Sequence, residues 1–166
     1  MLRYKGSLRR GKGTESVIFA DMEQPEKLAL LNARRAGTLM ETLGIRYTGL
    51  DEGGLHAEMP VGPQVHQPMG LLHGGATAAL AETLGSAYSF VSLPHPDRQA
   101  VVGQTLVAHH VRSVKDGTVR GTARFLHQGK RSHVVEIRIE DEHGRLVSTA
   151  TLTNAILELA ASDPTK

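Results

Sequence analysis

The chain has 166 residues, contains no cysteine and carries a formal net charge of +2 at pH 7. Its length suits one domain with a sizeable core, and the missing cysteines exclude disulfides, thiolate nucleophiles and cysteine-ligated metals. No apolar run approaches the ~20 residues of a membrane-spanning helix, and the N-terminus lacks the apolar core of a secretory signal. We therefore expect no membrane association and a cytoplasmic location.

The basic charge of the chain is concentrated at its N-terminus. Residues 1–13 hold basic residues and no acid, with a net charge of +5, which leaves −3 for residues 14–166. Because the basicity belongs to the tail, we predict no nucleic-acid binding. The chain divides into a basic N-terminal extension over 1–22, a single domain over 23–159 and a C-terminal tail over 160–166.

The first elements predicted in the domain are a helix and a hairpin. Apolar residues at i+3 and i+4 spacing between residues 25 and 44 indicate an amphipathic helix. Asn32 and Arg35 interrupt its apolar stripe and Gly37 weakens it further, so the segment forms either one continuous helix or a broken one. Strands over 45–50 and 55–59 then flank an Asp-Glu-Gly-Gly turn.

The segment 67–91 follows, and it predicts the central helix of the fold. It reads Gln-Pro-Met-Gly-Leu-Leu-His-Gly-Gly and continues with small apolar residues, with Leu80 and Leu84 at helical spacing and one acid, Glu82. A helix that is apolar on nearly every side is normally buried, and a carboxylate there is costly unless something uses or satisfies it. We interpret Glu82 as the working group of an enzyme; a carboxylate paired with a structural arginine is the alternative.

Gly74 and Gly75 fall at the start of this helix. Backbone N–H groups there are unpaired, the positive end of the helix dipole lies behind them, and glycine admits close approach. This arrangement suits a carbonyl oxygen that gains negative charge during acyl transfer, and Gln67 lies just upstream to hydrogen-bond the same group. Close packing of helix on sheet is the alternative reason for the glycines.

The spacing of Gly74 and Glu82 predicts a site shared between two chains. Eight residues of helix span about 12 Å, too far for both groups to flank one small reacting carbon in the same subunit. A second copy of the helix, running antiparallel, would bring its Glu82 to the Gly74 of the first. We therefore expect an isologous homodimer with two composite sites.

After the helix, four strands are predicted over 100–113, 118–127, 132–141 and 146–157. Short glycine-bearing turns join them, which is typical of an antiparallel meander. Together with the hairpin they predict an α+β fold, in which a curved antiparallel sheet of about six strands wraps round one long helix.

Weaker candidates lie on the helix and on the later strands. Ser86 shares the face of the acid and would hold a water or a substrate oxygen; for it and for Thr83, a hydroxyl bonded to its own helix is the alternative. His109 and His110 are neighbours on a strand and point to opposite faces, so we predict no metal site. The turn 129–132 offers two cations and a hydroxyl to a phosphate, with an ordinary solvated turn as the alternative.

The stretch Gln67–Gly75, with Glu82 and Ser86 behind it, resembles the hotdog-fold acyl-CoA thioesterases over about residues 39–158. More narrowly, it is similar to the branch that contains the 1,4-dihydroxy-2-naphthoyl-CoA hydrolase of menaquinone biosynthesis and the glutamate-type 4-hydroxybenzoyl-CoA thioesterases. The related phenylacetate-pathway thioesterases commonly carry Asn and Asp at the Gln67 and Glu82 positions, which favours the glutamate branch. The resemblance implies the hotdog fold, dimers whose sheets join edge to edge, and usually a tetramer.

The resemblance also implies roles for individual residues. Gln67, His73 and Gly74 would bind and polarise the thioester carbonyl, Glu82 of the partner subunit would be nucleophile or general base, and Ser86 would position water or the acyl group. Six further residues are implied to contact the rest of the substrate: Thr83, His110, Arg112, Lys130, Arg131 and Ser132. The resemblance places the last three of them at the nucleotide end of CoA.

We therefore predict an enzyme that hydrolyses an aryl- or other acyl-CoA thioester to the carboxylic acid and CoA. It would work as a homodimer or dimer of dimers, without a metal or organic cofactor. One alternative is a proofreading thioesterase that acts on misloaded acyl or aryl carrier proteins. The other is a non-catalytic hotdog module that binds acyl-CoA.

Overall fold

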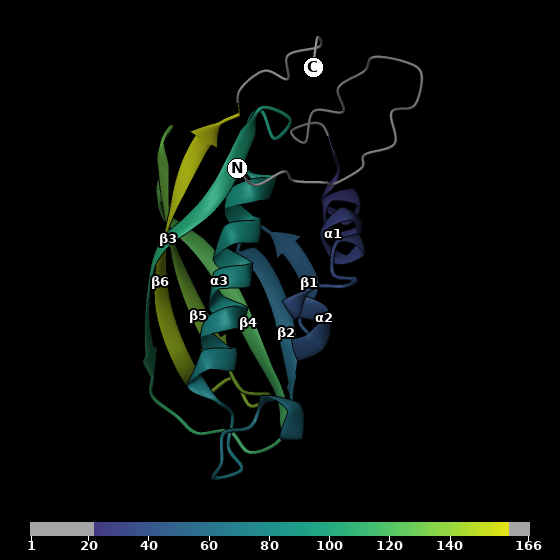
Figure 1. Cartoon of the computed structure of the whole chain (residues 1–166), viewed down its shortest axis with the longest axis vertical. Helices are drawn as coiled ribbons and strands as arrows, with labels where there is room; N and C mark the ends of the chain where they lie inside the picture. Colours follow the sequence, from purple (N-terminus) through teal and green to yellow (C-terminus); the bar gives the residue numbers. More distant parts are fainter. Residues whose placement is uncertain (1–21, 160–166) are drawn as a thin grey trace.

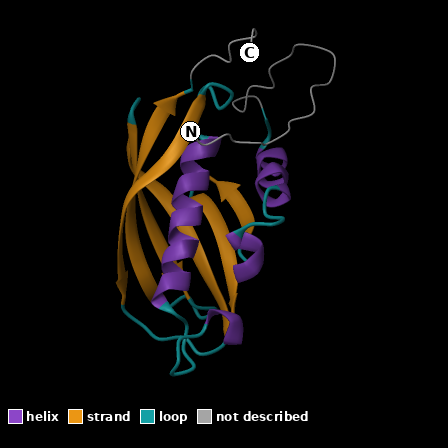
Figure 2. Cartoon of the chain, in the orientation of Figure 1, coloured by secondary structure: helices purple, strands orange, loops and turns teal. Residues whose placement is uncertain are grey.

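In the computed structural model, which describes residues 22–159, one antiparallel sheet curves round a long helix (Figure 1 and Figure 2). The elements in chain order are α1 (Gln24–Ala33), α2 (Leu39–Leu43), β1 (Arg46–Asp51), β2 (Gly54–Val61), the 3-10 helix η2 (Pro63–Val65), α3 (Gly74–Val91), β3 (Gln99–His110), β4 (Gly117–Gln128), β5 (Ser132–Glu140) and β6 (Leu146–Glu158). The predicted fold class is confirmed: six antiparallel strands accompany one long helix. The predicted extension, apart from Met22, and the predicted tail lie outside the described residues.

The order of strands in the sheet is β1-β2-β4-β5-β6-β3, which differs from the predicted meander in one respect. Strands β4, β5 and β6 do form a meander, but β3 pairs with β6 and not with β4. The reason is that β2 occupies the free side of β4, in register from Leu55↔Ala123 to Val61↔Gly117. After crossing the sheet in α3, the chain therefore adds β3 at the far edge.

Of the two possibilities for the first helix, the structure has the broken one, since α1 ends at Ala33 and α2 begins at Leu39. Gly37 lies between them with φ +71°, a left-handed conformation that glycine adopts without strain. The side chain of Asn32 fixes α1 to β1, since it accepts from the Tyr47 N–H at 3.1 Å and donates to the Tyr47 carbonyl at 2.9 Å.

One face of α3 packs closely on the sheet. Leu80 and Leu84 are fully buried, and burial of such a side chain stabilises the fold by ~1.5–3 kcal/mol. Glycines allow the close approach: a methyl group at Gly85 would lie 2.6 Å from Leu152, and one at Gly121 would lie 2.4 Å from Leu84.

The expectation that α3 is buried holds for most of the helix: nine of its residues are buried, and only Gly75 and Glu82 are exposed in the single chain. The sheet covers only one side of the helix, so Glu82 is exposed, while Thr83 and Ser86 are half-buried. Within the described residues, no helix is long and apolar enough to cross a membrane.

Candidate active site

The predicted helix start is confirmed: α3 begins at Gly74, and His73 is its N-cap residue. Nδ1 of His73 accepts a hydrogen bond from the Gly75 N–H at 2.7 Å, which satisfies one of the open donors of the first turn. A neutral imidazole whose Nδ1 accepts must carry its proton on Nε2. His73, which is exposed, therefore presents an N–H donor to solvent.

The Gly74 N–H is an open donor at the positive end of α3. Within the residues that the structure describes, no hydrogen-bond acceptor is found for it. A methyl group at this position would lie 2.9 Å from Nε2 of His110. The glycine therefore has a packing reason as well as a chemical one, since it lets the imidazole of β3 approach the helix start.

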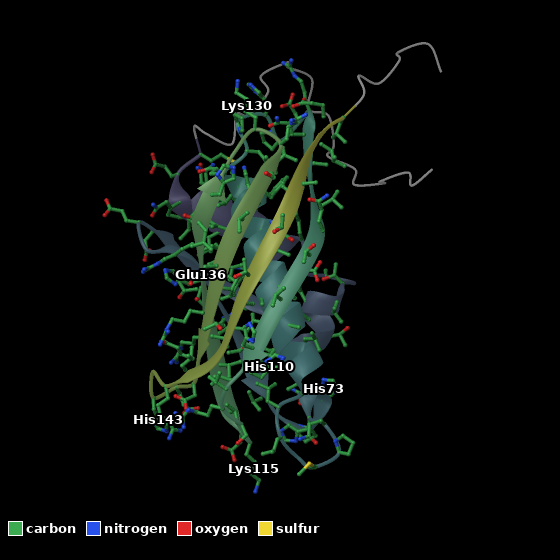
Figure 3. The ribbon with its side chains drawn as sticks, turned by 90° about the vertical axis from the view of Figure 1, so that its left-hand side faces the viewer. His73, His110, Lys115, Lys130, Glu136 and His143 are labelled. Carbon is green, nitrogen blue, oxygen red and sulfur yellow. The ribbon has the colours of Figure 1, made fainter. Side chains whose placement is uncertain are left out.

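A β-bulge decides which of the two neighbouring histidines meets the helix. The pairing of β3 with β6 shifts register between Gly103 and Thr105, so one extra residue enters β3 there. An extra residue reverses the alternation of side chains beyond it. As a result His110 lies against the start of α3, near His73 (Figure 3), and its neighbour His109 points to the other face.

The imidazole of His110 is held by Ser148 on β6. The Ser148 hydroxyl donates its one proton to the His109 carbonyl at 3.0 Å, and its oxygen lies 3.2 Å from Nδ1 of His110. Nδ1–H of His110 must therefore donate to that oxygen. In the neutral ring Nε2 then keeps its lone pair, and it faces Gly74.

A cavity of about 380 Å³ opens at this end of α3. It brings together four residues that the sequence singled out, Gln67, Gly74, His110 and Arg112. The side-chain oxygen of Gln67 accepts from the Met69 N–H, which leaves its NH₂ group as a donor. Backbone hydrogen bonds hold the loop, since the N–H of Leu72 donates to the Val114 carbonyl and that of His73 to the Val65 carbonyl.

Glu82 lies further along α3 and does not line this cavity. Within the described part of the chain, no arginine or lysine forms an ion pair with it. Its carboxylate lies beside β3, so close that a methyl group at Gly103 would be 2.8 Å from Oε1.

Ser86 is held by a buried amide that the sequence reasoning missed. Its hydroxyl donates to Oδ1 of Asn154 at 3.5 Å, and Nδ2 of Asn154 donates to the Gly85 carbonyl at 3.2 Å and to the Ser89 hydroxyl at 2.9 Å. Asn154 is fully buried. One signal existed in the sequence: the inward positions on either side of it along β6 read Ala150, Leu152 and Ile156, so a polar residue among them needs a buried partner.

Thr83 contributes its backbone to a contact with β1. The Tyr47 hydroxyl donates to the Thr83 carbonyl at 3.4 Å, and burial raises the pKa of that phenol. The bond ties the middle of α3 to the sheet, and the Thr83 side chain remains half-buried.

Lys130 and Arg131 lie on the β4–β5 turn and Ser132 begins β5, at the opposite end of the sheet from His73 (Figure 3). Lys130 lines a second cavity of about 370 Å³, with His133. His133 is buried, and burial lowers its pKa.

One chain therefore presents the predicted site residues as three separate groups. Gln67, His73, Gly74, His110 and Arg112 gather at the start of α3, and Glu82, Thr83 and Ser86 lie along its middle. Lys130, Arg131 and Ser132 lie at the far end. Among the described residues, no group of three or more His, Asp or Glu side chains is placed to hold a metal ion.

Residues 69–148 match the Thioesterase superfamily. The chain is 50% identical over 130 residues to the proofreading thioesterase EntH of Cronobacter turicensis, a match that covers 78% of this chain and 93% of that protein. The chain belongs to the thioesterase superfamily. The EntH protein of Klebsiella pneumoniae is 52% identical to this thioesterase over the same shares of the two chains.

Two solved structures support the same assignment. A mutant thioesterase from Pseudomonas aeruginosa is 39% identical, with a TM-score of 0.77 over 80% of this chain and 94% of that one. A thioesterase from Haemophilus influenzae is 33% identical, with a TM-score of 0.77 over 82% of this chain and 94% of that one. The chain is thus a hotdog-fold thioesterase, an enzyme that hydrolyses thioesters.

Proposed function

We propose that this thioesterase is a proofreading enzyme, which removes wrongly loaded acyl or aryl groups from the phosphopantetheine arm of a carrier protein. The observation that carries this proposal is the identity of about half of the aligned residues to two relatives named proofreading thioesterases, over 93% of their lengths. The specific branch suggested by the sequence, hydrolysis of aryl-CoA thioesters, is the second candidate. The basic turn with Lys130 and Arg131 favours it, because CoA carries phosphates that a carrier-protein arm lacks.

We propose that the thioester carbonyl binds at the start of α3. Its oxygen would accept from the Gly74 N–H, with the helix dipole and the donors of His73 and Gln67 stabilising the charge that develops. Glu82 would either attack the carbonyl carbon to give a mixed anhydride or remove a proton from the attacking water. In both cases the carbon–sulfur bond breaks, and the thiolate leaves and takes up a proton. On the anhydride route a water then hydrolyses the anhydride, which releases the carboxylic acid and restores the Glu82 carboxylate. We propose that no metal or organic cofactor takes part.

We propose that Glu82 acts on a carbonyl held by the other subunit of a dimer. The separation of Glu82 from Gly74 along one helix supports this arrangement. The edge strand β3 supports it as well, because it pairs on one side with β6 and exposes Val102 and Val107, 46% and 50% accessible. An unprotected, apolar edge strand is a surface suited to pairing with a second sheet. A dimer of dimers and a cytoplasmic location complete the proposal.

The role of Glu82 is tested by Glu82→Gln, assayed by thiol release. We expect kcat to fall by at least about 100-fold, the range for loss of a general base or nucleophile. Glu136→Gln is the matched control, because Glu136 is an exposed carboxylate on the outer face of β5 (Figure 3). Equal rates in Glu82→Gln and the wild type would contradict the assignment.

The choice of carrier is tested with one acyl group presented on two thiols. We expect kcat/KM to be higher when a benzoyl group is loaded on an aryl carrier protein than when it is carried by CoA. A preference for the CoA ester that disappears in the double variant Lys130→Ala, Arg131→Ala would instead support the aryl-CoA candidate.

A further inference from the structure

Gly103 on β3 lies directly beside the carboxylate of Glu82. A methyl group at this glycine would be 2.8 Å from Oε1, a separation that non-bonded carbon and oxygen atoms do not keep. The nearest atom outside Glu82 leaves room for it, because Oδ1 of Asn154 would be 3.8 Å away, an ordinary contact distance. A side chain at position 103 would therefore clash with the Glu82 carboxylate and with no other group nearby.

The strand cannot withdraw from the helix at this level. Gly103 is paired in register with Asn154 of β6. Asn154 is fully buried, and its amide donates to the Gly85 carbonyl and to the Ser89 hydroxyl, both on α3. These two bonds fix β6 to the helix about one and two turns beyond Glu82, and the backbone pairing fixes Gly103 to β6.

We propose that Gly103 is a positioning residue for Glu82: its bare backbone lets the carboxylate lie against β3, in the orientation from which it acts. This inference rests on the proposed catalytic role of Glu82. Since Glu82 is exposed and its side chain is flexible, a methyl group at 103 displaces the carboxylate without disturbing the core. The effect of the substitution is thus on the rate of the reaction, and the fold is preserved.

The test is Gly103→Ala, alone and combined with Glu82→Asp. A misplacement of about 1 Å lowers rates by up to ~100-fold, so we expect Gly103→Ala to lower kcat by about 10-fold or more. KM, Tm and the sedimentation coefficient should stay at their wild-type values. Glu82→Asp is one methylene shorter and draws the carboxylate back from the strand. In that background we expect Gly103→Ala to lower kcat by about threefold or less, because coupled residues are not additive.

Gly49→Ala is the matched control, since Gly49 lies beside a register shift in the opposite edge strand and its methyl group would meet His56 at 3.3 Å. It should leave kcat unchanged. The proposal is overturned if Gly103→Ala lowers kcat by the same factor in both backgrounds, or if it changes Tm or the assembly. The variant Glu82→Gln separates the proposed role of Glu82 from that of Gly103. If Glu82→Gln has the wild-type rate, the proposed role of Glu82 is refuted. If Glu82→Gln is inactive while Gly103→Ala is fully active, only the role of Gly103 is refuted.

Discussion

Two imidazole rings at the start of α3 are fixed in opposite tautomers. His73 accepts through Nδ1 from the Gly75 N–H, so its exposed Nε2 is a donor. His110 donates through Nδ1 to Ser148, so its Nε2 holds a lone pair. A donor and an acceptor thus flank the open Gly74 N–H, an arrangement that suits a substrate carbonyl on one side and a substrate N–H or water on the other.

The different positions of the neighbouring residues His109 and His110 are directly testable. We expect His110→Ala to lower kcat/KM by about 10-fold, because a hydrogen bond at the site and a wall of the cavity are lost. The measurement is steady-state thiol release. His109→Ala is the control, since that ring points to the other face of β3 and should leave kcat/KM unchanged. Equal losses in the two variants would mean that the bulge does not select the working histidine.

At the scale of elements, the β5–β6 turn is organised by one buried carboxylate. Asp141 accepts from the backbone N–H groups of His143 and Arg145 at 3.0 Å each, and from Nε of Arg145 at 2.7 Å. Burial raises the pKa of Asp141, but these hydrogen bonds outweigh it and lower the pKa below its ordinary value. A carboxyl group with a lowered pKa in the folded state stabilises the fold above its unfolded pKa, and this contribution is lost as the pH falls.

We therefore expect Asp141→Asn to lower Tm at pH 7, with a difference from the wild type that shrinks as the pH falls below about 4. Thermal unfolding followed by circular dichroism between pH 7 and pH 3 measures this. Glu140→Gln is the control, because it removes a partly exposed pair with Arg138 that contributes little. A Tm difference that is independent of pH would show that the Asp141 charge is not what organises the turn.

At the scale of the whole molecule, the proposed function makes the edge strand β3 the link between assembly and activity. Its neighbour in the sheet is β6, and its other side is open in a single chain. Because Gly74 and Glu82 belong to different parts of α3, catalysis in the proposed scheme requires two chains. Assembly and turnover should therefore be lost together.

Val107→Lys tests this link. A lysine on an edge strand opposes strand pairing, so we expect a shift from dimer or tetramer to monomer and a parallel loss of kcat. Analytical ultracentrifugation and thiol release on the same samples measure the two effects. Leu39→Lys, at an equally exposed apolar position in α2, should change neither. An active monomer would contradict the shared site.

The sequence by itself determined the elements of this protein and the start of its site. Apolar spacing and the glycine pair located α3 from Gly74 onwards, and the turn residues located the strands, because these signals act between near neighbours in the chain. The likeness of the stretch around Gln67 to thioesterases identified the family.

The tertiary structure decided what depends on residues that are distant in the chain. It placed β3 beside β6, since β2 had already taken the free side of β4. It selected His110 over His109, because a bulge is a feature of pairing between strands that no side-chain pattern records. It also joined Asn154 to Ser86, 68 residues apart, and laid Glu82 against Gly103. Such contacts form only when the helix and the sheet meet, so local sequence rules could not supply them.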